Sequence, residues 1–358
     1  MIDSYRSIDM LPAKQNIDIM NDVEVYDDNF TLLSKCPAVE QFRWVRRFSR
    51  PGEFLLITSF SPEKLQLYRP PIIDRTTNRV IREGNIIYKR DNDEACLITG
   101  VNVVMLLDGD IRLIVRGWSL SRILDRRVVV LNGDFTLNNL LTTIVNDNFL
   151  SLGPRSMSPL LRLISMPNFG GDIIPVEYRR SEVLTNVIDL CQENAIGLRI
   201  RYNISNRTYD LEFYNPVESV AVFDKEWGNV LEQDYIENVE NYKNTVLVGE
   251  NFIFNNDITG ISRREMAAPE PREGATRFSQ IALDALNRSR AIRTLSSRID
   301  VESVQFEYGK DWDLGSIVLS RNRSIGFSEK EVITEIIEFF DKEGKNVEVN
   351  TGDYIERS

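Results

Sequence analysis

The residue types that most often carry acid–base and nucleophilic chemistry are sparse in this chain. Its 358 residues include no histidine, which excludes a Ser-His-Asp triad, a Cys-His pair and an imidazole ligand for zinc. Gly117 to Ser121 (GWSLS) begins like a nucleophile elbow, but the second glycine of that motif is missing. These absences argue against the common hydrolytic mechanisms.

Three further groups of residues are poor candidates for a site. The loop Gly170-Gly171-Asp172 lacks the lysine and the spacing of a phosphate-binding loop. Asp311 and Asp313 are a carboxylate pair of the kind that cleaves glycosides, but with 54 Asp and Glu residues such a pair is far more often a turn or surface feature. The cysteines, which are few and far apart, are Cys36, Cys96 and Cys191. We therefore predict no catalytic, cofactor or metal site and no enzymatic activity.

The length of the chain predicts two or three domains, and its composition is ordinary for a soluble globular protein. The net charge of -11 argues against a protein that binds duplex DNA by neutralising phosphates, and we predict no sequence-specific nucleic-acid binding. No stretch approaches the roughly 20 apolar residues of a spanning helix, so no membrane partner is predicted. Three separated, unpaired cysteines fit assembly in a reducing cytoplasm.

The passage from Asp108 to Val129 organises the first part of the chain. Ile111 to Val115 alternates as a strand, and Asp108-Gly109 before it predicts a hairpin turn. After Gly117 we predict a short helix capped by Ser119. Its apolar side is formed by Leu120, Ile123 and Leu124, and its other side by Arg122, Arg126 and Arg127. These arginines indicate a solvated or subunit-facing surface.

A second basic segment lies near residue 290 of this acidic chain. Apolar spacing predicts the longest helix, from Thr276 to about residue 297. Its basic side chains include Arg277, Arg288, Arg290 and Arg293. No aromatic residues interleave with them, which disfavours nucleic-acid binding. We predict internal ion pairs or a docking face for an acidic neighbour, and count these arginines with the first three as possible subunit-interface residues.

Periodicity divides the chain into four regions. Residues 1–22 are weakly patterned and are predicted to be an N-terminal arm. Residues 23–133 are predicted to form short antiparallel strands. In the strand 42–48, one face is predicted to carry Phe42, Trp44, Arg46 and Phe48. Residues 134–218 contain helical periods and form a small α/β unit. Residues 219–358 return to strands, with the helix near 276–297 among them.

The α/β unit carries the clearest local signals. Thr136 precedes apolar residues at helical spacing, and Ser181 precedes a second helix that Gly197 is expected to end. Leu198 to Tyr202 and Tyr209 to Tyr214 are predicted to pair as a hairpin. The fold class is therefore mainly β with an α+β insertion: two barrel-like antiparallel β domains separated by a small α/β domain.

Three passages together carry a family resemblance. They are GWSLSRILDRRVV at residues 117–129, the aromatic and basic stretch 42–60 that ends in RPGEFLLITSF, and the closing passage 308–353 with YGKDWDLGSIVLS and EKEVITEIIEFFDKEGKNVEVNTGD. They resemble siphophage tail proteins of the ReqiPepy type, which are similar in fold to baseplate hub and tail-tip proteins and to the N-terminal part of tail-associated lysins. In that family a Leu-Gly-Asp step leads into a strand, whereas Leu314-Gly315-Ser316 stands here.

The resemblance implies a structural virion component of a phage tail tip or baseplate, assembled in the host bacterial cytoplasm. Such hubs are usually homotrimers whose two barrel-like domains present six pseudo-equivalent positions. Such a trimer would join a six-fold tail tube to a three-fold tip and form part of the DNA channel. The implied partners are the tail tube protein, distal-tail or adaptor proteins, a tip or spike protein and the tape-measure protein. No catalytic motif belongs to the resemblance.

Three alternatives stay open at this point. A distal-tail or adaptor ring would form six-fold rings of a single barrel. A cell-wall-degrading tail lysin would need a hydrolase domain, for which no room is expected after the closing strand. A carbohydrate-binding role for residues 134–218 is also open, but the tyrosines there are more typical of core and strand positions.

Overall fold

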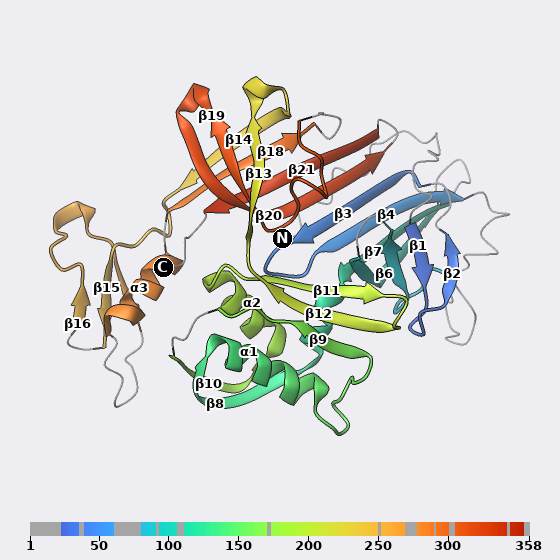
Figure 1. Ribbon diagram of the computed structural model, residues 1–358, viewed down its shortest axis with the longest axis horizontal. Coiled ribbons are helices and arrows are strands. Elements are labelled where there is room, and N and C mark those ends of the chain that lie inside the picture. The colour runs from blue at the N-terminus through green and yellow to red at the C-terminus, as the bar shows by residue number, and fades with distance from the viewer. Residues whose placement is uncertain are drawn as a thin grey trace.

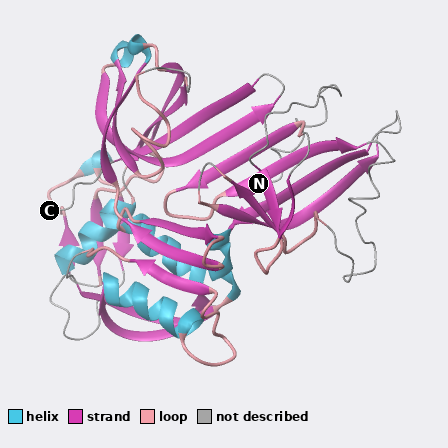
Figure 2. Cartoon of the chain, turned by 45° about the vertical axis from the view of Figure 1, so that its right-hand side comes forward, coloured by secondary structure: helices cyan, strands magenta, loops and turns pink. Residues whose placement is uncertain are grey.

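The computed structural model is built mainly of antiparallel strands, with a smaller helical part beneath them (Figure 1). It describes residues 23–35, 39–60, 80–90, 93–105, 111–169, 173–249, 252–268, 278–289, 291–300, 305–341 and 344–353. The predicted arm at residues 1–22 and the Asp108-Gly109 turn lie outside these residues. Figure 2 shows most of the helical segments gathered below the large sheet.

The first β region supplies one half of the large sheet. Its strands are β1 (Val23–Tyr26), β2 (Leu32–Lys35), β3 (Gln41–Arg47), β4 (Glu53–Phe60), β5 (Ile86–Lys89), β6 (Ala95–Met105) and β7 (Ile111–Ser119). The predicted pairing of β6 with β7 is confirmed, from Cys96 opposite Ser119 to Met105 opposite Ile111. On β3 the period-two prediction is also confirmed, because Phe42, Trp44 and Arg46 are all buried.

The passage after β7 enters a short 3₁₀-helix, η3 (Leu120–Arg126). Leu120, Ile123 and Leu124 are buried, as their spacing predicted. The predicted cap is wrong, because Ser119 makes no side-chain cap hydrogen bond. Its hydroxyl instead accepts from the Gly52 backbone N–H at 2.9 Å and so ties η3 to the start of β4.

The α/β unit follows. Its elements are β8 (Val128–Thr136), α1 (Leu137–Val145), the π-helical turn η4 (Asn146–Leu150), β9 (Leu161–Ser165), β10 (Ile173–Glu182), α2 (Val183–Glu193), β11 (Gly197–Asn203) and β12 (Thr208–Tyr214). The hairpin β11–β12 is confirmed, and β9 adds to it in parallel. A separate ribbon pairs β8 with β10. This unit has its own apolar core, which also receives Tyr26 and Phe30 from the first β region.

The helix caps of this unit were predicted in part. Thr136 caps α1 by accepting from the Asn139 N–H, as predicted. The predicted cap of α2 is wrong: Ser181 is still part of β10, and its hydroxyl accepts from the Asn186 side chain. Gly197 opens β11 and does not end α2, which ends at Glu193 with Asn194 as its C-cap. At Gly197 an added Cβ would meet the Tyr214 ring at 2.3 Å.

The second β region completes the large sheet. Its strands are β13 (Val217–Asp224), β14 (Val230–Asn238), β18 (Ile292–Ile299), β19 (Ser316–Asn322), β20 (Phe327–Asp341) and β21 (Gly344–Asp353), with 3₁₀ turns η5 (Lys225–Trp227) and η7 (Arg323–Ile325). The two regions meet where β20 pairs with β3, from Glu335 opposite Arg47 to Phe340 opposite Phe42. The strand order starts at β14 and ends at β2, so the described strands do not close a barrel. The two-barrel organisation and the domain boundaries stay predictions.

A small subdomain is inserted in the sequence between β14 and β18, and it lies at the left of Figure 1. It consists of β15 (Thr245–Val248), β16 (Phe252–Phe254), the turn η6 (Gly260–Ser262), β17 (Glu265–Ala268) and α3 (Phe278–Arg288). The helix predicted for residues 276–297 is wrong beyond Arg288. Residues from Ile292 onward form β18, because Leu295, Ser297 and Ile299 are buried at period two between β14 and β21.

Candidate functional site

The arginines predicted from the first basic segment lie on the outer side of η3 and just after it. Arg122 pairs with Asp125 at 3.0 Å and lies over the Trp118 ring. Arg126 is exposed, and Arg127 is half-buried with its guanidinium donating to the backbone oxygens of Arg126 and Arg155. The predicted outward orientation is confirmed for Arg122 and Arg126, whereas Arg127 is half-buried. The role of the group as a subunit interface stays a prediction.

The two arginines of the second basic segment that the structure describes, Arg288 and Arg293, lie on different elements. Arg293 is exposed on β18 and pairs across the strands with Glu237 on β14, at 3.2 Å. Arg288 is the last residue of α3. Arg277 and Arg290 lie outside the described residues. The predicted alternative of internal ion pairs therefore holds for Arg293.

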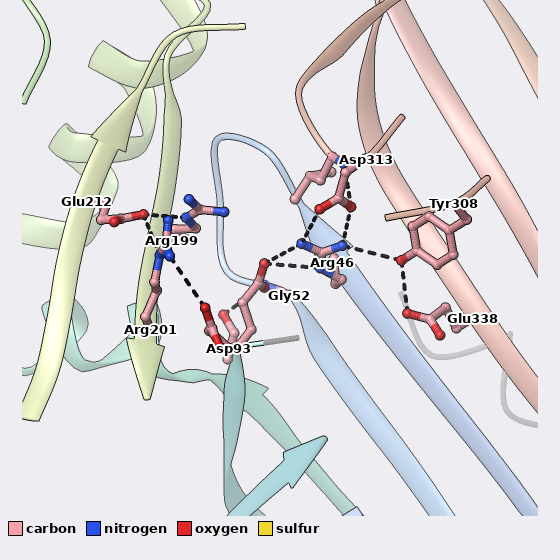
Figure 3. A network of polar contacts seen from close by, with 12 residues as sticks. Arg46, Gly52, Asp93, Arg199, Arg201, Glu212, Tyr308, Asp313 and Glu338 are labelled. Atoms are coloured by element: carbon pink, nitrogen blue, oxygen red, sulfur yellow. Dashed lines mark hydrogen bonds and ion pairs between the residues drawn. The ribbon is translucent and has the colours of Figure 1, made fainter. Parts of the chain in front are cut away.

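The most extensive charged site in the described structure is a buried network at the junction of the two β regions (Figure 3). Arg46 on β3 is 4% exposed. Its guanidinium donates to the Glu94 carboxylate at 2.8 Å and to the Asp313 carboxylate at 2.5 Å. It also donates to the Tyr308 hydroxyl at 3.3 Å. One side chain of the first β region thus holds groups from the β5–β6 connection and from the loop before β19.

A second buried charge continues the network. Glu338 on β20 is fully buried and accepts from the Tyr308 hydroxyl at 3.0 Å. Its other oxygen lies 2.5 Å from the Lys89 Nζ on β5 and 3.1 Å from the Lys345 Nζ on β21. Lys89 is 2% exposed. A buried carboxylate with two ammonium partners and a hydroxyl donor is satisfied electrostatically, which is the condition for keeping a charge inside.

The same network reaches the α/β unit. Arg199 and Arg201 on β11 both donate to Glu212 on β12, at 2.5 Å and 2.8 Å. Arg201 also reaches Asp93, whose backbone oxygen accepts from the Tyr202 N–H at 2.7 Å. The close-up shows these groups beside those around Arg46, and the two sets meet at the neighbouring residues Asp93 and Glu94 (Figure 3). The three parts of the fold are therefore joined by charge-assisted hydrogen bonds as well as by strand pairing.

The pKa shifts in the network keep Glu338 and Arg46 charged and Tyr308 neutral. Burial alone would raise the pKa of Glu338, but Lys89 and Lys345 outweigh it and hold this pKa below 4.5. Burial likewise opposes the charge of Arg46, but Glu94, Tyr308 and Asp313 outweigh it and raise the pKa of Arg46 well above its ordinary value. Burial raises the pKa of the Tyr308 hydroxyl well above 10, so Tyr308 stays a neutral donor to Glu338.

The charged groups of this site are paired with one another. Its carboxylates face cations, its tyrosine is a neutral donor, and the described residues hold no group of three or more Cys, Asp or Glu side chains placed to bind a metal. Cys96 and Cys191 are buried free thiols whose pKa values are raised by burial, so both stay protonated. We assign the network the role of fixing the junction between the β regions.

Acid is expected to destabilise this junction, in part by protonating Glu338. Its pKa lies lower in the folded state than in the unfolded state, so its contribution to stability is complete above about pH 4.5 and is lost as the pH falls through the folded pKa. Glu24 and Asp210, whose pKa values are also lowered, act in the same direction. We expect the urea midpoint to fall between about pH 5 and pH 3, with a shallower fall in Glu338→Gln. An equal slope in both proteins would contradict the assignment.

Sequence reasoning missed most of this network. It placed Arg46 on a buried face but gave it no partner, and it treated Asp313 as a turn residue. A usable signal was present, because Lys89 and Glu338 stand at apolar-face positions of the strands IIYK and VITEIIEFF. A charged residue at a buried position of a strand predicts a buried partner. The partner's identity, 249 residues away in one case, is not a local property.

Comparison with solved structures identifies the class of fold. The 43 kDa tail protein of prophage MuSo2 from Shewanella oneidensis superposes with a TM-score of 0.60 at 12% identity, covering 92% of this chain and 98% of that one. A tail protein from Neisseria meningitidis MC58 gives 0.59 at 12% identity, covering 93% and 96%. Prophage tail protein gp18 from Listeria monocytogenes gives 0.56 at 11% identity, covering 92% and 94%. The fold is that of phage tail proteins.

A family match gives a more specific assignment than the likeness in fold. The model of the Siphovirus ReqiPepy6 Gp37-like proteins matches residues 22–353, so this chain belongs to that family of siphophage tail proteins. This confirms the resemblance seen in the sequence. No curated protein matches the chain. Among the described residues, no helix has the length and apolar character needed to cross a membrane.

Proposed function

We propose that this protein is a hub of the phage tail tip or baseplate. The observation that carries the proposal is the likeness to tail proteins over more than nine-tenths of the chain, including nearly the whole of the MuSo2 protein. A francisella PdpA–VgrG complex also matches, with a TM-score of 0.51 at 12% identity over 96% of this chain and 55% of that one. The hub role is that of a structural component and not of an enzyme.

In this role three copies form a ring, and each copy contributes its two β regions. The six β regions face a six-fold tail tube, while the threefold symmetry suits a tip or spike below. The buried network around Arg46 and Glu338 supports this arrangement, because it holds the two β regions of one copy together. Domain boundaries near residues 22, 133 and 218 are part of the proposal.

The proposed partners are the tail tube protein, distal-tail or adaptor proteins, the tip or spike protein and the tape-measure protein. The ring would enclose part of the DNA channel. An acidic wall suits that position, since phosphates must pass without binding, and the chain carries a net charge of -11. A channel wall lined by Arg293 and Arg298 would count strongly against this placement.

The symmetry of the assembled protein tests the hub. We expect light scattering to give three times the 41.3 kDa chain mass, and particle imaging to show a three-fold ring with a central opening. A six-fold ring would assign the protein to a distal-tail or adaptor position. Turnover of purified peptidoglycan that a carboxylate substitution abolishes would support the tail lysin alternative. If the purified chain is monomeric, imaging of intact tails locates it and decides between these positions.

A further inference from the structure

One surface of this acidic protein carries arginines that form no ion pair with the carboxylates of the described residues. It lies where η3 leads into β8 and where β10 leads into α2, at the bottom of Figure 1. We call it the arginine ribbon and define it by four arginines and two neighbouring valines. They are Arg126, Arg127, Arg155, Arg180, Val128 and Val130. None of these arginines has an ion pair within the part of the chain that the structure describes.

Backbone geometry brings these residues together. The Val183 N–H donates to the Arg127 oxygen at 3.0 Å, which places the end of β10 beside the start of β8. Arg155 donates to the Val128 oxygen at 2.7 Å, and Arg127 donates to the Arg155 oxygen at 3.3 Å. Arg180 sits at a bulge opposite Val129 and Val130. The guanidiniums of Arg127 and Arg155 are thus positioned by uncharged backbone acceptors.

Three carboxylates close to these arginines in the sequence are engaged elsewhere. Asp125 pairs with Arg122, Glu177 pairs with Arg179, and Glu182 accepts from the Thr185 hydroxyl. Arginines that stay close together without counter-charges repel one another, and the repulsion is relieved when an anionic partner arrives. Because Arg127 and Arg155 are already held by hydrogen bonds, less side-chain entropy is lost on docking.

Apolar exposure beside the arginines indicates a protein partner. Val130 is 71% exposed and Val128 is 49% exposed, and both point outward on alternate positions of β8. Leu152, in the same loop as Arg155, is 101% exposed. No aromatic side chain among the exposed large hydrophobics belongs to this surface, so it lacks the stacking platform of a nucleic-acid site. Arginine beside exposed aliphatic residues is typical of a protein interface.

We propose that the arginine ribbon docks on an acidic surface of a second copy of this chain. The inference rests on the proposed hub, in which copies meet. The net charge of -11 includes the ribbon, so the remainder of each copy is more acidic still and complements it. The contact would join unlike surfaces, which is the kind of contact that closes a cyclic ring.

Two residues provide a matched test. Arg180 has φ 59°, and Arg207, on the exposed turn after β11, has φ 55°. Glycine adopts such angles without strain, so Arg180→Gly and Arg207→Gly each remove one charge from an exposed left-handed arginine without disturbing the fold. Only the first lies on the ribbon. Circular dichroism and thermal melting check that both variants remain folded.

Sedimentation velocity between about 1 and 100 µM measures self-association. We expect Arg180→Gly alone to weaken it at low salt, and Arg180→Gly combined with Arg126→Glu to weaken it about 10-fold, with both differences shrinking near 1 M salt. Arg207→Gly should leave it unchanged. A photoreactive residue at Val130 should cross-link to peptides of a second copy.

Three outcomes would overturn the proposal: no self-association over this range, equal association in the ribbon and control variants, or cross-links from Val130 only within one copy. A three-fold ring in particle images together with any of these outcomes would refute the ribbon contact and leave the hub standing. Conversely, a six-fold ring that depends on Arg126 and Arg180 would keep the ribbon contact and refute the hub.

Discussion

Replacing Glu338 with alanine is expected to lower the free energy of unfolding by about 3–5 kcal/mol. Glu338 is fully buried, and its carboxylate lies 2.5 Å from Lys89 and 3.1 Å from Lys345. Removing one partner of a buried ion pair leaves the other charge in a poorly solvated position, and that penalty exceeds the value of the pair itself. The Lys345 side chain is 31% exposed and can turn to water, whereas the buried Lys89 side chain cannot. Urea unfolding followed by fluorescence measures the change.

Two variants test whether the loss comes from Lys89. The double variant Glu338→Leu with Lys89→Met replaces the pair by apolar side chains of similar size, and we expect it to recover most of the lost stability. Glu329→Ala, on the exposed part of the same strand, should change stability by less than about 0.5 kcal/mol. A loss below about 1 kcal/mol in Glu338→Ala, or no recovery in the double variant, would contradict the prediction.

Strand periodicity predicted the first β region well because it is a local property. Phe42, Trp44 and Arg46 were placed on one face, and all three are buried. Periodicity could not show that this face changes neighbours along β3. Phe42 and Trp44 pack in the core of the first β region, whereas Phe48 packs with the second. Arg46 lies between these two cores, at the point where the β regions meet.

The helix predicted to reach residue 297 shows where periodicity fails. Ile292 and Leu295 fit a helical stripe that begins at Phe278, and they fit an alternating strand as well. The choice depends on strands from distant parts of the chain, since β18 pairs with β14 on one side and β21 on the other. Tertiary pairing therefore decided a segment whose local pattern was ambiguous.

The candidate site divides along the same line. The outward position of Arg122 and Arg126 followed from the spacing of the buried leucines of η3, so it could be predicted. The network of Arg46, Asp313 and Glu338 could not, because its members are brought together by strand pairing across 267 residues of sequence. A single sequence shows which charged residues are buried more readily than which of them meet.

Gly117→Ala is expected to destabilise the protein by about 3 kcal/mol or more, because no space exists for a methyl group. Gly117 lies on β7 between β4 and β6, opposite Phe54 and Ile98. An added Cβ would meet the Leu97 carbonyl oxygen at 1.9 Å and the Phe54 ring at 2.6 Å. The backbone oxygen cannot move aside without breaking the β6–β7 pairing. Thermal and urea unfolding of the purified variant measure the loss, and poor soluble yield is the expected companion.

Gly100→Ala is the matched control on the neighbouring strand. There an added Cβ would meet only the Arg116 side chain, at 3.1 Å, and that side chain is long enough to shift. We expect a change within about 0.5 kcal/mol, since the substitution touches no backbone atom of a partner strand. The same β7 strand leads through Gly117 into η3 and the arginine ribbon, so distortion at Gly117 should also weaken self-association. Equal stability of the two variants would show that β6 and β7 can separate locally, contrary to a rigid sheet at this point.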